Sequence, residues 1–326
     1  MDPRSLPKVS VIIPFYKNFG YLKECVAHCL ALDYSDYEVI VVSNSPVGFD
    51  DERIKVVVTD DVGQAYKKDL GIAHASGEIC AFIDDDAYPR KDWIRNALKY
   101  FKEPSVVAVG GPGVTPSDDG LMQKAGGLVY SLPIGSGRFY YRYVADETNN
   151  ADALQGYNLF VRKIFFKEVG EINVRYRSGE DNILSERIAA AGKDFVYAPD
   201  VVVFHHRRPL FIPHLRQIST YALHRGHFLK RYPAFSKKLP YVLPSMFLLT
   251  IVSWALLSIS IPVLRLPLVA MIGGYFAVSF AFALFVSKSI KMSALTSVGV
   301  ALSHLTYAIH FIRGFFMRDI GERPSY

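Results

Sequence analysis

Residues 79–89 read ICAFIDDDAYP, an apolar run of five residues that leads directly into three consecutive aspartates. A short, uncharged run bounded by turn residues is typical of a buried strand. Adjacent like charges disfavour one another unless a cation neutralises them, and carboxylate oxygens suit Mg²⁺ or Mn²⁺. The stretch therefore predicts a strand that ends at a divalent metal site, the alternative being an exposed acidic turn.

On both sides of this stretch, short strand-like runs alternate with helix-like stretches. Strands are predicted at Val9–Phe15, Tyr37–Ser43, Ile54–Thr59, Ile79–Ile83, Val106–Gly110, Phe195–Ala198 and Val201–Phe204, with helices at Gly20–Leu32, Gly63–Ala75, Lys91–Phe101 and Asp181–Ala191. This alternation predicts an α/β fold with a mostly parallel sheet and helices on both faces. Ligands of such sheets bind at the carboxyl ends of the strands. Residues 113–155 lack a clear period and are expected to form a long irregular excursion.

The composition and charge of the chain exclude several classes of protein. At 326 residues, half of them hydrophobic, the chain is too long for a small stapled module and too apolar for a disordered one. Residues 1–200 carry 23 Lys and Arg against 29 Asp and Glu, whereas residues 201–326 carry 14 against 2. Because the basic part also holds the longest apolar runs, a membrane is favoured over nucleic acid as the partner. The three cysteines fit no disulfide or zinc pattern and are expected to be buried thiols.

Two apolar runs near the C-terminus, 241–264 and 266–286, are each long enough to cross the roughly 30 Å hydrocarbon core of a bilayer. Lysines precede the first run and follow the second, so the positive-inside rule predicts a hairpin with both ends in the cytosol. A third run, 293–316, carries a polar stripe and could span the membrane or lie in its interface; its terminal arginines favour the interface. The basic stretch 205–240 is expected to contact anionic headgroups, its alternative being a solvated helix face.

These features predict three successive segments. An α/β domain at 1–204 is followed by the basic interface segment at 205–240 and a membrane region at 241–326. The N-terminus lacks the layout of a signal peptide, so the α/β domain is expected in the cytosol. The chain is thus predicted to be a multi-pass protein of the cell membrane or of another cytosol-facing membrane.

Several motifs, in this order along the chain, resemble those of family 2 glycosyltransferases with the GT-A fold. The likeness runs from residue 8 to about residue 230. It rests on Val9–Tyr16 (VSVIIPFY), Gly63–Gly71, the acidic triplet, Gly156–Arg162 and Gly179–Asn182. Each motif alone is moderately specific, but their common order makes the resemblance strong. It implies an enzyme that transfers sugar from a nucleotide-diphosphate sugar, UDP- or GDP-linked.

By this resemblance, Asp84 and Asp86 are the outer carboxylates of an Asp-x-Asp motif that holds Mg²⁺ or Mn²⁺. His205 is expected as a further metal ligand, in preference to His206, because it follows the last strand directly. The donor is expected to contact Pro14, Phe15, Asn44, Lys68, Asp84, Asp85 and Arg208.

Glycosyl transfer requires an acceptor hydroxyl to lose its proton, and a positioned carboxylate can act as the general base. Asp181 matches the base of the family, and Glu180 stands beside it as a second catalytic candidate. The alternative is that both acids only cap the amino end of a helix. Asn158 and Arg225 are expected to contact the acceptor.

The sequence thus predicts an inverting, metal-dependent transferase that moves a single sugar to a membrane-held, lipid-linked acceptor. Processive synthases of the family carry Gln-x-x-Arg-Trp and many spans, whereas here Gln217 is followed by Ile-Ser-Thr-Tyr. The absence of a Gly-x-Gly-x-x-Gly turn and of a Walker loop excludes dehydrogenases and P-loop enzymes. The alternatives are a polyprenyl-phosphate sugar synthase, a nucleotidyltransferase, and a membrane-tethered sugar-nucleotide-binding protein without turnover.

Overall fold

The chain folds into two compact units. The computed structural model describes residues 6–60, 62–145, 154–170, 172, 180–231, 239–318 and 320, except the side chains of Glu180, Asn182 and Arg231. The first unit holds the chain up to Val114 together with Val144–His206, and the second holds Thr115–Tyr143 and Arg207–Gly321. Both units are therefore built from segments that are distant in the sequence.

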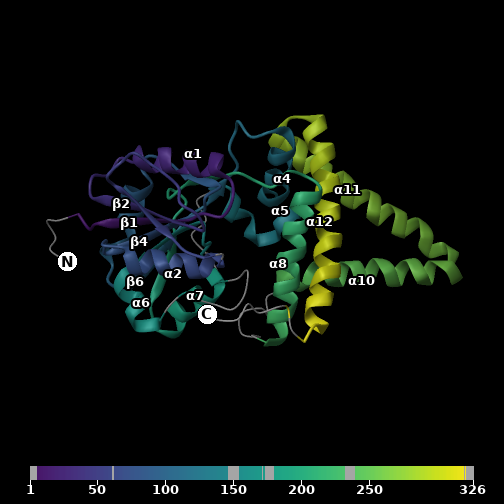
Figure 1. Ribbon diagram of the computed structural model, residues 1–326. Coiled ribbons are helices and arrows are strands. Elements are labelled where there is room, and N and C mark those ends of the chain that lie inside the picture. Colours follow the sequence, from purple (N-terminus) through teal and green to yellow (C-terminus); the bar gives the residue numbers. More distant parts are fainter. Residues whose placement is uncertain are drawn as a thin grey trace. The chain divides into compact units, whose positions relative to one another are not determined.

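A seven-stranded sheet forms the centre of the first unit, in the order β3-β2-β1-β4-β8-β6-β9 (Figure 1). Its strands are β1 (Val9–Pro14), β2 (Tyr37–Ser43), β3 (Ile54–Val58), β4 (Ile79–Ile83), β6 (Val106–Gly110), β8 (Asn158–Arg162) and β9 (Asp194–Tyr197). Neighbouring strands are parallel except that β8 runs antiparallel to both β4 and β6. The prediction of a mostly parallel α/β sheet is confirmed.

Helices cover both faces of this sheet, as the alternating pattern predicts. They are α1 (Phe19–Leu30), α2 (Gln64–His74), α3 (Trp93–Leu98), α6 (Lys163–Val169) and α7 (Glu180–Ala190), with a short 3₁₀ helix η1 at Tyr100–Lys102. Alternate residues of β1 point to opposite faces. Val11 and Ile13 share a core cluster with Leu22 of α1, whereas Ile12 packs against Gly71 of α2. The three cysteines are free and buried, as expected.

A second, three-stranded sheet in the same unit has the order β5-β10-β7. Its strands are β5 (Ala87–Pro89), β7 (Gly113–Val114) and β10 (Val203–His205). The sequence pattern predicts a strand at 201–204 as part of the main sheet, but the structure places it here, antiparallel to β5. Strands of two or three residues show no measurable period, so β5 and β7 have no signature in the sequence.

The prediction that 113–155 is an irregular excursion is wrong for the residues that the structure describes there. This stretch forms α4 (Leu121–Ser131), α5 (Pro133–Ser136) and the 3₁₀ helix η2 (Gly137–Tyr143), all in the second unit. Gly126 and Gly127 weaken the helical pattern of α4, but the packing requires them. A Cβ on Gly126 would lie 2.7 Å from the carbonyl oxygen of Arg208, and one on Gly127 would overlap Thr115.

The second unit is otherwise built from long C-terminal helices. They are α8 (Ile212–Arg231), α10 (Leu239–Ser260), α11 (Arg265–Ser287) and α12 (Ile290–Phe316), with the 3₁₀ helix η3 at Pro262–Leu264. Within the described residues, the helices over 239–260, 262–287 and 290–316 are long and apolar enough to cross a membrane. The C-terminal helices thus fit a membrane region, and the segment 115–143 belongs to the same unit.

Candidate metal and donor site

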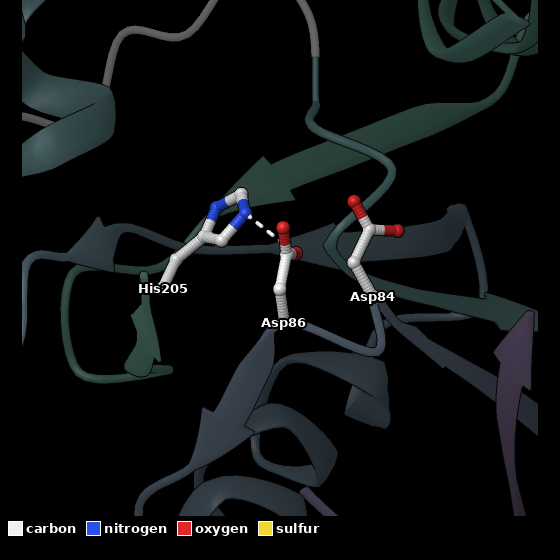
Figure 2. A group of neighbouring side chains, drawn as sticks. All are labelled: Asp84, Asp86 and His205. Carbon is white, nitrogen blue, oxygen red and sulfur yellow. Dashed lines mark hydrogen bonds and ion pairs between the residues drawn. The ribbon is translucent and has the colours of Figure 1, made fainter. Parts of the chain in front are cut away.

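Three potential metal ligands meet where β4 ends. The chain turns between Ile83, the last residue of β4, and Ala87, the first of β5, so that the acidic triplet occupies the turn. The pairing of β10 with β5 sets His205 opposite Ala87. One ligand atom each of Asp84, Asp86 and His205 lies within 4.8 Å of the others. Figure 2 shows these three side chains next to one another.

The chemistry of this group fits a divalent cation. Nε2 of His205 lies 3.0 Å from Oδ1 of Asp86, and Oδ1 of Asp84 is buried with no hydrogen-bond partner among the described residues. Burial raises the pKa of Asp84 to about 6, helped by the nearby charge of Asp86 and opposed by that of Lys68. A buried carboxylate oxygen without a partner is unfavourable unless a cation or donor reaches it. Two carboxylates and an imidazole suit Mn²⁺ or Mg²⁺.

The middle aspartate of the triplet has a different contact. Oδ2 of Asp85 accepts a hydrogen bond of 2.9 Å from the backbone N–H of Tyr16, in the loop after β1. The buried Lys67 donates from Nζ to the carbonyl oxygen of Phe15 in the same loop. Sequence reasoning singled out the neighbouring Lys68 and missed Lys67, because a lysine on an amphipathic helix gives no signal that it is buried. Asp85 and Lys67 therefore fix the position of the loop that contains Phe15, a residue predicted to contact the nucleotide of the donor.

The predicted donor-binding residues of the first unit lie at one edge of the sheet. Pro14 ends β1, Asn44 follows β2, and Asp84 follows β4; these three strands are neighbours and parallel. Phe15 is buried and packs edge-on against Phe19 of α1, with ring centroids 6.5 Å apart. The topology thus brings these candidates to the carboxyl edge of the sheet, where ligands of α/β folds bind. Their contacts with a donor stay predictions.

Helix α1 supports the strand end that carries His205. The next residue, His206, is buried; its Nε2 lies 2.9 Å from Oε2 of Glu24, and its ring stacks on Tyr21 with centroids 4.5 Å apart. The backbone N–H of His206 donates to the carbonyl oxygen of Asp86 over 3.0 Å. No sequence motif marked Glu24 or Tyr21, although their spacing of three places both on one face of the helix. The structure brings His205, not His206, to the acidic pair.

The prediction that Asn158 contacts the acceptor needs correction. Its side chain is completely buried in β8. Oδ1 accepts a bond of 2.8 Å from Nε1 of Trp93, and Nδ2 donates to the carbonyl oxygens of Pro112 and Val201 at 3.0 and 2.7 Å. This amide is committed to the fold, because its acceptor and both of its donors are engaged.

The other predicted site residues are not part of the Asp84–Asp86–His205 group. Asp181 is half-buried in the first turn of α7, where its carbonyl oxygen accepts from Oγ of Ser185 over 2.8 Å; the side chain of Glu180 lies outside the described residues. Arg208 is exposed in the second unit, and the Arg225 guanidinium lies 4.3 Å from the ring centroid of Tyr241. Their roles as base, donor contact and acceptor contact stay predictions.

Comparison with known proteins finds a family match in the N-terminal half of the chain and several relatives. Residues 10–169 match the model of the family described as glycosyl transferase family 2. Glycosyltransferase AglE of Haloferax volcanii is 28% identical over 225 residues, which cover 63% of this chain and 69% of AglE. A dolichyl N-acetyl-α-D-glucosaminyl phosphate 3-β-D-2,3-diacetamido-2,3-dideoxy-β-D-glucuronosyltransferase of Methanococcus voltae is 19% identical over 243 residues, or 68% of this chain and 74% of that protein.

The fold also resembles a solved structure. The mannosyltransferase PcManGT of Pyrobaculum calidifontis, determined in complex with GDP-Man and Mn²⁺, superposes with a TM-score of 0.61. The match covers 93% of this chain and 88% of PcManGT at 20% sequence identity. The predicted GT-A fold is therefore confirmed.

Proposed function

Since the chain is a glycosyltransferase of family 2, we propose that it transfers one sugar from a UDP- or GDP-linked donor to a lipid-linked acceptor, with inversion at the anomeric carbon. The observation that carries this proposal is the group of Asp84, Asp86 and His205 at the carboxyl edge of β4. In this group, Oδ1 of Asp84 is buried without a hydrogen-bond partner and could bind a divalent cation. Such a cation would in turn bind the diphosphate of the donor.

In this mechanism the residues of the first unit hold the donor and move one proton. Asp84, Asp86 and His205 would hold the cation, which when bound offsets the negative charge that develops on the leaving diphosphate. Lys68 places a positive charge near the carboxylate of Asp84. Asp181 would take the proton from the acceptor hydroxyl as that oxygen attacks the anomeric carbon. One base and no covalent sugar-enzyme intermediate imply inversion.

Two observations support a lipid-linked acceptor. The name of the M. voltae relative describes transfer to a dolichyl-phosphate-linked sugar. The second unit of this chain contains three helices that could cross a membrane, among the residues that the structure describes. We place the protein at a cytosol-facing membrane as a multi-pass protein, because lysines flank the apolar hairpin at both of its ends.

The decisive experiment supplies purified protein in detergent with a panel of radiolabelled UDP- and GDP-sugars and two acceptor classes: polyprenyl phosphate and lipid-linked saccharides. Label that enters the organic phase, together with one released nucleoside diphosphate per transfer, is the expected result. Released pyrophosphate would instead show nucleotidyl transfer. Donor binding without either product would show a binding protein without turnover.

Variants in the same assay assign the residues. Asp86→Asn is expected to abolish Mn²⁺ binding, and Asp181→Asn is expected to lower transfer about 10²-fold or more while donor binding persists. Asp33→Asn is the matched control, since Asp33 is exposed and pairs with Arg95. Full transfer activity in Asp181→Asn would remove Asp181 as the base.

A further inference from the structure

Helix α8 lies alongside the C-terminal half of α12. The contacts follow the same order on both helices, so the two run parallel: His214 Nε2 lies 2.9 Å from Ser303 Oγ, Gly226 packs against the carbonyl group of Phe311, and Lys230 Nζ donates to the carbonyl oxygen of Met317 over 3.0 Å. Figure 1 shows the two helices side by side. Wherever α12 lies in a membrane, α8 must therefore lie at the same depth.

The face of α12 that is not covered by α8 is mainly apolar. Six exposed apolar residues, spaced by 4, 4, 7, 4 and 7 positions, form one stripe along the helix: Ile290, Ala294, Val298, Leu305, Ile309 and Phe316. The exposed cations Lys291 and Arg313 lie near its two ends. The residues that meet α8 and the loop before it, such as Gly299, Ser303 and Gly314, lie on the opposite face. Helix α12 therefore packs against the rest of the second unit on one side and exposes a mainly apolar surface on the other.

The positive charges of α8 disfavour a position of this helix in the hydrocarbon core of a bilayer. Arg216 and Lys230 are exposed on it, and Arg225 lies between them. No Asp or Glu occurs between Val201 and Arg318 that could neutralise these charges within the segment. A cation in the centre of a bilayer is strongly unfavourable, whereas at the headgroups it is attracted to anionic lipid.

Helices α10 and α11 are less buried in the protein than α12. Only 11% of the most apolar window of each is buried, against 39% for α12. The start of α10 contacts α12 through Ser245, whose Oγ lies 3.5 Å from the carbonyl oxygen of Ala308, and α11 does so through Tyr275, whose hydroxyl lies 2.9 Å from Nδ1 of His304. Beyond these contacts the hairpin projects away from the α8–α12 pair (Figure 1).

We propose that α8 and α12 lie flat in the headgroup layer of an anionic membrane, and that α10 and α11 alone enter the hydrocarbon. The apolar stripe of α12 then faces the acyl chains, and α8 covers α12 from the water side with its cations at headgroup level. The third apolar helix is thus a docking surface for lipid, not a third span. Both of its ends then lie on the same, cytosolic side of the membrane, which rests on the proposed function.

Depth measurements on the full chain test this arrangement. Single cysteines are placed at Ala294, Val298, Leu305, Ile309 and Phe316, spin-labelled, and reconstituted in vesicles of phosphatidylcholine and phosphatidylglycerol; the native cysteines are buried. A helix in the interface gives five similar depths by power-saturation EPR. A spanning helix gives depths that change along about 33 Å, since 22 residues separate the first and last labels. The matched control is the exposed pair Leu249 and Leu256 of α10, whose depths should differ.

Labelling from outside sealed vesicles gives an independent answer. Lys291, in the first turn of α12, and Arg318, just beyond its last residue, are exposed and are each replaced by cysteine (Lys291→Cys, Arg318→Cys). We expect a membrane-impermeant maleimide to label both from the side that labels Lys102→Cys in the first unit, and to label Val263→Cys at the hairpin tip from the other side. Labelling of positions 291 and 318 from opposite sides, or a depth profile with a maximum in the middle of α12, would overturn the proposal.

Discussion

At the residue scale, Asn158 connects three segments of the first unit through one amide. Its partners are the indole of Trp93 and the carbonyl oxygens of Pro112 and Val201. Asn158→Ala leaves these buried groups without partners, so we expect the free energy of unfolding to fall by about 2–4 kcal/mol. Urea unfolding of the purified protein, followed by fluorescence, measures this loss.

The same variant separates a structural role from acceptor binding. Where Asn158→Ala remains folded, the KM for the acceptor should equal that of the wild type. A raised KM with unchanged stability would restore Asn158 as an acceptor contact. The sequence placed this residue in a motif, but a motif does not show which of its side chains point into the core.

Glu24 offers a prediction about positioning. Because it holds His206, whose backbone binds the carbonyl of Asp86, Glu24→Ala should loosen the strand end that carries His205. Loss of a residue that orients metal ligands weakens metal binding by about 10- to 100-fold, and we expect the lower end here. The Kd for Mn²⁺, measured by EPR, provides the test.

Two further variants make this prediction specific. Glu24→Gln can still accept a hydrogen bond from His206 and should lose less affinity than Glu24→Ala. Glu103→Gln, at an exposed position, is the charge-matched control and should bind Mn²⁺ like the wild type. An unchanged Kd in Glu24→Ala would show that α1 does not position the metal ligands.

Glu38 makes the stability of the first unit depend on pH. Burial raises the pKa of this carboxyl, but hydrogen bonds from Ser10 and Ser76 more than offset that and hold the pKa below its ordinary value of 4.5. A lowered pKa stabilises the fold above 4.5, and this stability is lost as the pH falls through the lower, folded-state pKa. Glu38→Gln should therefore flatten the dependence of the free energy of unfolding on pH as the pH falls below the ordinary carboxyl value of 4.5. Glu52→Gln, at an exposed position, should leave it unchanged.

At the scale of elements, the sequence predicts what has a period and misses what depends on distant packing. Strands β2, β4 and β6 begin and end where their apolar runs do, because each run is buried in the sheet. Helix α4 escapes detection because two glycines interrupt its pattern, and the reason for them is contact with segments far along the chain. The metal site divides similarly: the acidic triplet is visible in the sequence, whereas the Glu24–His206 contact spans 182 positions.

The packing of α8 against α12 depends on two glycines. A Cβ on Gly314 would overlap the carbonyl group of Leu223, and one on Gly226 would overlap that of Phe311. Backbone atoms cannot yield as a flexible side chain can, so Gly314→Ala should cost about 1–3 kcal/mol and lower the midpoint of thermal unfolding in detergent. Gly273→Ala in α11 is the control, since nothing lies within 4 Å of its Cβ. An equal midpoint in both variants would contradict this packing.

At the scale of the whole molecule, segments distant in the sequence form each unit. The sequence predicts a linear series of domains at 1–204, 205–240 and 241–326 because composition changes at those positions. The structure changes unit near the first of these boundaries, at His206, but it also assigns 115–143 to the helical unit. Composition could not indicate this, because the apolar face of α4 is short and its partner, α12, begins 159 positions after α4 ends.

This grouping changes what truncation should do. Deletion of residues 240–326, which a linear division treats as removal of an anchor, also removes the partner of α8 and α4. Ala222 of α8 and Ala125 and Val129 of α4 are at most 1% exposed, and Val300 of α12 shares a core cluster with the last two. Exposed apolar surface of this kind favours association.

We expect the chain 1–239 to aggregate without detergent, as measured by size-exclusion chromatography and light scattering. The full chain in detergent is the reference. A monodisperse, folded 1–239 fragment in aqueous buffer would show that α4 and α8 are independent of α12.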